Sequence, residues 1–120
     1  MDIRECYEQF GGDYDDVVNR LRKEERIIKY VKMFMAGDDY SLVEQAVMAN
    51  NDADAFLNVH NLKGVALNLG LTPLYQRASV LCEALRPGNP PVDRMLQELM
   101  LKDIKDAYDS IIEAFSKMSC

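Results

Sequence analysis

The apolar residues of this chain recur at helical spacing in every long segment, and this periodicity limits the folds open to it. Near the C-terminus the apolar positions alternate at intervals of four and three residues: Met100, Ile104, Ala107, Ile111, Ala114 and Met118. Such spacing places side chains on one face of an α-helix, whereas a half-buried strand alternates apolar and polar residues. No segment shows convincing strand alternation. A helix with one apolar stripe needs neighbouring helices to cover it, so the sequence predicts a helical bundle.

Turn and capping residues divide the N-terminal half into four expected helices. The first ends at the glycine pair that follows Phe10, and Asp13 caps the second. The third ends at Gly37, and the fourth follows Ser41 as its N-cap. The sequence leaves open whether the chain between Gly37 and Ser41 forms a true break or only a kink.

Three longer helices are expected in the C-terminal half. The first runs from about Asn51 to Leu69 and ends at Gly70, which suits the left-handed conformation that follows many helices. Thr72 is the expected N-cap of the next helix, with Pro73 at its first position. The segment "RPGNPP" then separates this helix from the last one, because proline and glycine do not continue a helix.

The connections between these helices indicate how they are arranged. Short connections between long amphipathic helices favour antiparallel neighbours. We therefore expect an all-α fold, an up-and-down antiparallel four-helix bundle with an additional N-terminal helix. A chain of 120 residues is long enough for one core and too short for two, so a single domain over residues 1–120 is expected.

The balance of charge bears on the partners of the chain. Lys and Arg number 14 against 20 Asp and Glu, a net charge of −6. An acidic surface repels phosphate groups, so nucleic acid and membranes are not expected as partners, although a local patch of opposite charge can escape this rule. No apolar run approaches the roughly 18 residues of a membrane span, and the polar N-terminus does not resemble a signal peptide.

The cysteines indicate a reducing environment. Cys6, Cys82 and Cys120 are odd in number, widely spaced and never arranged as CxxC. This pattern favours reduced thiols in a cytoplasmic protein over a disulfide framework or a zinc site. We expect Cys82 to be a buried core residue and Cys120 to have no special role.

The only histidine, His60, is expected on the solvent-facing side of its helix. On a helical wheel of about 100° per residue, the core stripe consists of Ala55, Val59, Leu62, Ala66 and Leu69. His60 falls well away from that stripe, so its imidazole is predicted to face water. Lys63 and Gly64 follow three and four residues later and neighbour it on the helix surface.

A glycine in the middle of this helix needs an explanation, because it costs roughly 1 kcal/mol relative to alanine. Either a molecule from outside must approach the backbone at Gly64, or another helix of the chain packs closely there. The sequence leaves both explanations open. Phe56 and Leu67 are expected as partly exposed apolar residues on either side of the histidine.

An accessible imidazole beside an ammonium group suits a phosphoryl group held on nitrogen. Free imidazole has a pKa of about 6.5, so a neutral fraction that can attack phosphorus exists at neutral pH. The Lys63 ammonium would pair with the phosphoryl oxygens, and Gly64 would leave room for the donor. Catalytic carboxylates and a metal ion would come from the donor.

The stretch "HNLKGVALNLG" resembles the signature of histidine-containing phosphotransfer (HPt) domains, which is His-x-x-Lys-Gly followed six residues later by Gly. These positions are His60, Lys63, Gly64 and Gly70. The resemblance implies a four-helix up-and-down bundle and reversible phosphorylation of His60 by an aspartyl-phosphate on a response-regulator receiver domain. It also implies that the chain needs no cofactor, with Mg²⁺ held by the receiver. Lys63 would steady the phosphoryl group, and Gly64 would leave room for docking.

The same resemblance suggests which neighbours contact the partners, namely receiver domains and a hybrid histidine kinase. The expected partner-binding residues are Phe56, Leu67 and Asn68, with Leu67 standing where the family usually carries a small residue. In the following helix, Gln76, Ser79, Glu83 and Arg86 form a polar stripe. If that stripe borders His60, one of Gln76, Ser79 and Glu83 is expected to support the imidazole or the phosphate. A monomer is expected, because the apolar stripes are used up within one bundle.

Two other classes of function compete with the phosphorelay carrier. One is a helical adaptor, including a degenerate HPt domain that binds receivers without phosphorylation. The other is an enzyme, but a di-metal bundle needs paired Glu-x-x-His motifs that one histidine cannot supply. No nucleophile elbow appears, and no glycine-rich nucleotide-binding segment is present. We therefore expect a non-enzymatic carrier that does not phosphorylate itself with ATP.

Overall fold

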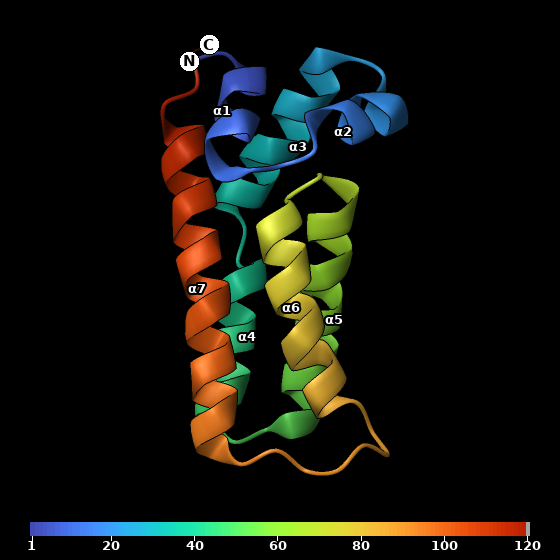
Figure 1. Ribbon diagram of the computed structural model, residues 1–120, viewed down its shortest axis with the longest axis vertical. Coiled ribbons are helices and arrows are strands. Elements are labelled where there is room, and N and C mark those ends of the chain that lie inside the picture. Colours follow the sequence, from blue (N-terminus) through green and yellow to red (C-terminus); the bar gives the residue numbers. More distant parts are fainter. Residues whose placement is uncertain (120) are drawn as a thin grey trace.

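The computed structural model describes residues 1–119, which form seven helices and no strand (Figure 1). The helices are α1 (Ile3–Phe10), α2 (Tyr14–Leu21), α3 (Glu24–Ala36), α4 (Asp39–Met48), α5 (Asp52–Asn68), α6 (Thr72–Leu85) and α7 (Arg94–Ser116). Cys120 lies outside the described residues. The expected all-α class is confirmed.

Helices α4 to α7 form the expected up-and-down bundle. The chain descends through α4, rises through α5, descends through α6 and rises through α7 (Figure 1). Helix α5 packs against α4 and α6, and α7 packs against α6 and α4. Helices α5 and α7 therefore occupy diagonal positions, so that one side of α5 is left facing solvent.

The N-terminal addition consists of three short helices gathered at one end of the bundle. Helix α1 packs against the C-terminal part of α7, and α2 packs against α3 (Figure 1). The N-cap Asp13 accepts a hydrogen bond from the backbone N–H of Asp16, as predicted. These helices lie over the end of the bundle where α5 passes into α6.

The predicted core stripe of α5 is confirmed. All five of its residues are buried: Ala55, Val59, Leu62, Ala66 and Leu69. In α7 the central members of the stripe are also buried. Met100 is only half-buried, and so is Met118, which lies beyond the end of α7 at Ser116. Each lies toward an end of the bundle, where fewer neighbouring helices remain to cover it. Cys82 is buried in the core, as expected.

Two predicted helix starts are wrong, by three residues in α4 and by one in α6. Helix α4 begins at Asp39 rather than after Ser41, whose hydroxyl donates to the Asp38 carbonyl from within the first turn. Helix α6 begins at Thr72 itself, with Leu71 as its N-cap. Leu71 is fully buried, so packing anchors the chain one residue earlier than the capping preference of threonine suggests.

The segment between α3 and α4 is a true break rather than a kink. Gly37 adopts an extended conformation with ψ of 178°, and its N–H donates to the Phe34 carbonyl. Gly70, in contrast, has the predicted left-handed conformation with φ of +63°. A tight turn there directs the chain from α5 into α6.

The N-terminal helices bind the last carbonyls of α5. The Tyr7 hydroxyl donates to the Leu69 carbonyl at 2.7 Å, and the backbone N–H of Asp13 donates to the Gly70 carbonyl at 2.9 Å. The Arg20 guanidinium donates to the carbonyls of Leu67 and Asn68. The final turn of a helix leaves carbonyls without intrahelical partners, and here α1 and α2 supply those partners.

Tyr7→Phe is expected to lower the free energy of unfolding by about 1–3 kcal/mol, because it leaves the Leu69 carbonyl buried without its donor. Burial raises the pKa of the Tyr7 hydroxyl, so this group stays protonated as a donor. Urea unfolding measures the difference. Tyr14→Phe is the matched control, since within residues 1–119 the Tyr14 hydroxyl makes no hydrogen bond to a protein group. Equal losses in the two variants would contradict the role assigned to Tyr7.

None of the helices formed by residues 1–119 combines the length and apolar character needed to cross a bilayer.

Candidate functional site

His60 lies on the side of α5 that faces away from the bundle, and its side chain is exposed as predicted. Its ring centroid is 5.9 Å from that of Phe56, one turn earlier, with the two planes tilted by 51°. Among the described residues, no protein group makes a hydrogen bond to the imidazole. The neighbouring Asn61 amide donates to Asp39 of α4 at 3.0 Å, which helps hold α5 in register. The ring is therefore open to a molecule from solvent.

The outward face of α5 continues as an exposed stripe with His60 inside it. Its members are spaced three, four and three residues apart: Leu57, His60, Gly64 and Leu67. Leu57 is 65 % exposed and Leu67 is 50 % exposed. Sequence reasoning included Leu67 but missed Leu57, although the same helical spacing would have found it. The imidazole thus lies between two exposed apolar side chains that a partner can cover.

Gly64 faces open space. A Cβ atom built at this position would meet no atom of the protein within 4 Å, apart from its own helix backbone and chain neighbours. Close packing of another described helix therefore does not explain this glycine. Approach by an outside molecule stays a prediction, with which the open space at Gly64 is consistent.

Lys63 places its ammonium group between α5 and α6. Its Nζ atom lies 5.9 Å from the centroid of the Tyr75 ring, near the start of α6. This is within the range of a cation–π contact, which favours one position of a long side chain without neutralising its charge. Within residues 1–119, no carboxylate lies in ion-pair distance of Lys63. The ammonium therefore lies over Tyr75, and no carboxylate of residues 1–119 pairs with it.

The structure brings Arg86 and Glu83, at the end of α6, to the other side of the site. The Arg86 guanidinium lies 5.4 Å from the Phe56 ring centroid and pairs with Glu83 at 3.1 Å. Hydrogen bonds from Arg86 and Asn89 hold the pKa of the Glu83 carboxyl below its usual range. Glu83 thus stays ionised and orients Arg86 over Phe56, whose ring in turn neighbours His60.

The remaining residues of the polar stripe, Gln76 and Ser79, make no hydrogen bond to the imidazole. The Ser79 hydroxyl donates to the Tyr75 carbonyl at 2.7 Å, within its own helix. Gln76 is exposed. Supporting roles for Gln76, Ser79 and Glu83 stay predictions. Sequence reasoning missed Tyr75, because its contact with Lys63 depends on how α5 and α6 are aligned.

Two further predicted residues lie near the end of α5. Asn68 is exposed, and its carbonyl is bound by Arg20 together with that of Leu67. Phe56 is half-buried between His60 and Arg86. No group of three or more side chains among the described residues is arranged to hold a metal ion. That the chain needs no metal of its own stays a prediction.

Fold and site together describe an antiparallel helical bundle that displays one accessible histidine, with a lysine and a glycine one turn away. The family model described as Hpt domain matches residues 33–114. This match covers more than half of the chain, which therefore belongs to the Hpt domain family. Neither the curated proteins nor the solved structures searched include a match.

Membership of this family implies a phosphotransfer-related role in two-component signalling. Hpt domains are phosphocarrier modules that interact with receiver domains and histidine kinases. The matched range begins near the end of α3 and contains α4, α5 and α6 in full. The site around His60 lies inside the matched range, whereas α1 and α2 lie before it.

Proposed function

We propose that this protein carries a phosphoryl group on His60, which it accepts from an aspartyl-phosphate of a receiver domain and passes on to another partner. The proposal rests on three features that lie within about one turn of α5: the imidazole of His60, the open surface at Gly64 and the ammonium of Lys63. An exposed imidazole with no protein hydrogen bond lies beside Gly64, where the surface is open, and Lys63, whose ammonium has no ion pair within the described chain.

In the transfer, a neutral ring nitrogen of His60 attacks the phosphorus atom of the aspartyl-phosphate. The new N–P bond forms as the bond between phosphorus and the aspartyl oxygen breaks, and the carboxylate of the receiver leaves with that electron pair. The proton on the other ring nitrogen is free to pass to solvent, because that face of α5 is exposed. The reverse reaction returns the phosphoryl group to the aspartate of a receiver.

The residues around His60 bind the phosphoryl group and the receiver. The Lys63 ammonium pairs with the phosphoryl oxygens, where charge-assisted hydrogen bonds are strongest. Gly64 lets the receiver approach the helix backbone. The receiver supplies Mg²⁺ and its own carboxylates, so this chain contributes the nucleophile and one cation and does not phosphorylate itself with ATP. Phe56, Leu67 and Asn68 contact the receiver around the histidine.

The test is transfer of labelled phosphate. The protein is mixed with a phosphorylated receiver domain, and labelled protein is followed over time, with His60→Gln as the control. The proposal expects a label that is lost in acid, is stable in alkali and is absent from His60→Gln. Receiver binding without any label on the native chain would refute the carrier role and identify a degenerate Hpt adaptor instead.

Lys63→Ala is expected to slow phosphoryl transfer by about tenfold or more, because a charge that balances the phosphoryl oxygens in the transition state is lost. The fold is expected to remain, since Lys63 is half-buried and alanine favours a helix. Transfer is measured as above, and thermal unfolding checks stability. Lys102→Ala on α7 removes an exposed cation far from the site and is expected to transfer at the native rate. A native rate for Lys63→Ala would exclude the proposed role of Lys63.

A further inference from the structure

The Lys and Arg residues of this acidic protein are concentrated at one end of the molecule. Between residues 20 and 32 there are six Lys and Arg residues and only two Glu residues, although the whole chain has a net charge of −6. Five of these cations form what is here called the basic cluster: Arg22, Lys23, Arg26, Lys29 and Lys32. The whole of this segment precedes the range matched by the family model, so the family role does not account for it.

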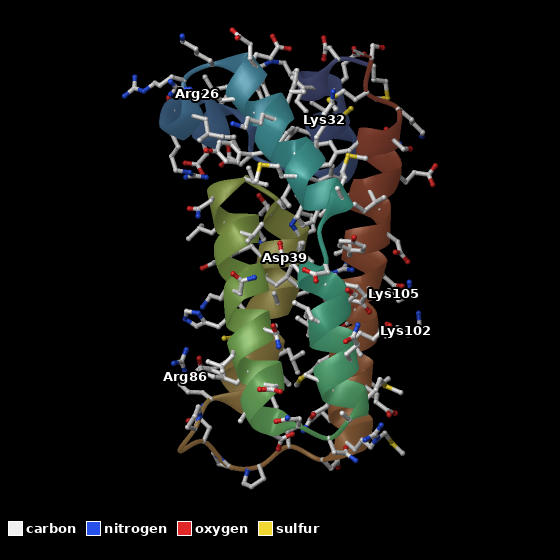
Figure 2. The ribbon with its side chains drawn as sticks, turned by 180° about the vertical axis from the view of Figure 1, so that it is seen from behind. Arg26, Lys32, Asp39, Arg86, Lys102 and Lys105 are labelled. Atoms are coloured by element: carbon white, nitrogen blue, oxygen red, sulfur yellow. The ribbon has the colours of Figure 1, made fainter. Side chains whose placement is uncertain are left out.

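The basic cluster differs from the paired lysines of α7 in having no ion-pair partner among the described residues. All five side chains are exposed, and within residues 1–119 none lies in ion-pair distance of a carboxylate. On α7, in contrast, Lys102 pairs with Asp106 and Lys105 pairs with Asp109. Figure 2 shows Arg26 and Lys32 at the end of the molecule formed by the N-terminal helices, and Lys102 and Lys105 along α7. Unpaired cations concentrated in this way create a local positive field on an otherwise negative surface.

A groove lies beside the cluster, between α2, α3 and α5. It has a volume of about 480 Å³ and is lined mainly by apolar side chains of α2, α3 and α5, with Arg20, Asn68 and Asp39 of α4 as its polar members. On its rim Tyr30 is 41 % exposed and Met33 is 58 % exposed. Arg26 lies one turn before Tyr30, and Lys29 lies one turn before Met33, so cations flank the apolar groove along α3.

We propose that this groove and the basic cluster together bind an acidic amphipathic helix of a partner protein. The apolar side of such a helix would fill the groove, and its carboxylates would meet the cations along α3, as in the recognition of amphipathic helices by grooves. An apolar groove favours a protein partner over nucleic acid, because a phosphate backbone carries no apolar side chains to place there. His60 does not line the groove, although Asn68, one of the residues proposed to contact the receiver, does. Peptide binding in the groove therefore requires no phosphoryl transfer to His60.

The experiment titrates the full chain, labelled with ¹⁵N, with a synthetic helical peptide that carries Leu and Phe on one face and Glu on the other. Chemical-shift changes are expected at α3 and at the α5 residues that line the groove, with a Kd of about 1 mM or tighter. Binding is expected to weaken as salt is raised, because exposed charges are screened. A peptide of the same composition in scrambled order tests the need for an amphipathic face. His60→Gln is expected to bind as the native chain does, which separates this proposal from the carrier function.

Charge-reversal variants locate the binding. Arg26→Glu combined with Lys29→Glu is expected to weaken the peptide affinity about tenfold or more. Met33→Asp is also expected to weaken it, because a carboxylate would then lie where the apolar face of the peptide packs into the groove. Lys102→Glu combined with Lys105→Glu changes the charge equally on α7 and is expected to leave the affinity unchanged. Circular dichroism checks that each variant is folded.

Several results would overturn the proposal. One is the absence of shift changes with the acidic peptide, and another is an equal loss of affinity in the two double variants. Equal binding of the scrambled peptide would show that charge alone accounts for the affinity and that the apolar groove does not contribute. Binding to phosphatidylglycerol-containing vesicles or to duplex DNA without binding to the peptide would assign the cluster to a membrane or to nucleic acid.

Discussion

Gly64→Gln is expected to slow phosphoryl transfer to His60 at least about a hundredfold without unfolding the protein. The new side chain would extend from the exposed stripe of α5, one turn from the imidazole, and would hold a receiver away from the reacting nitrogen. Misplacement of reacting groups by about 1 Å is enough for such a loss. Because a Cβ atom at Gly64 meets no described atom within 4 Å beyond its own helix backbone and chain neighbours, the bundle itself has no reason to resist the substitution.

In Gly64→Gln the rate of phosphoryl transfer is therefore expected to fall, while the thermal stability is expected to stay the same or rise. Glycine inside a helix is less favourable than other residues by roughly 1 kcal/mol, so Gly64→Gln is expected to unfold at the native temperature or above it. Transfer from a phosphorylated receiver and thermal unfolding measure the two effects. Gly64→Ala is expected to transfer at an intermediate rate, and Lys102→Gln on α7 at the native rate. Transfer by Gly64→Gln at the native rate would show that receivers do not approach across this glycine.

Gly70→Ala is expected to lower the free energy of unfolding by about 2–4 kcal/mol, for two reasons that add. The residue has a φ of +63°, a conformation that costs about 1 kcal/mol once a Cβ is present. The Cβ would also lie 2.5 Å from Cγ2 of Val17 and 2.6 Å from the carbonyl oxygen of Asp13. Crowding of this kind in a packed region costs about 1–3 kcal/mol, since the backbone of Asp13, the N-cap of α2, would have to move.

Gly11→Ala separates the two contributions. Gly11 also follows a helix with a positive φ, of +77°, but a Cβ there would meet nothing within 4 Å. It is therefore expected to lose only about 1 kcal/mol, from the backbone conformation alone. Urea unfolding of the two variants measures both values. Equal losses would mean that the close contact between Gly70 and the N-terminal helices contributes nothing to stability.

The order of the helices could be predicted because their signals are local, whereas the break between α3 and α4 was left open. Apolar spacing, the N-cap Asp13 and the left-handed Gly70 act within one or two turns of the chain, and the structure confirms each of them. The starts of α4 and α6 could not be placed from Ser41 and Thr72. In α6 burial of Leu71 outweighs the capping preference, since a buried leucine contributes more free energy than one cap.

The candidate site was predictable to the extent that it lies on one helix. His60, Lys63 and Gly64 are related by helical spacing alone, so exposure of the imidazole followed from the core stripe of α5. The contacts of Lys63 with Tyr75 and of Phe56 with Arg86 join two helices. Their alignment depends on the turn at Gly70 and on the packing of the whole interface, which no local pattern specifies.

By itself, the sequence determined which residues of α5 face the core and which face solvent, because the angle between successive residues of a helix does not depend on its surroundings. The tertiary structure alone decided what lies beside that solvent-facing side. It left the space next to Gly64 empty, placed Lys63 over Tyr75, and brought α1 and α2 onto the last carbonyls of α5. These features join residues far apart in the chain, and packing determines them only when every helix is in place.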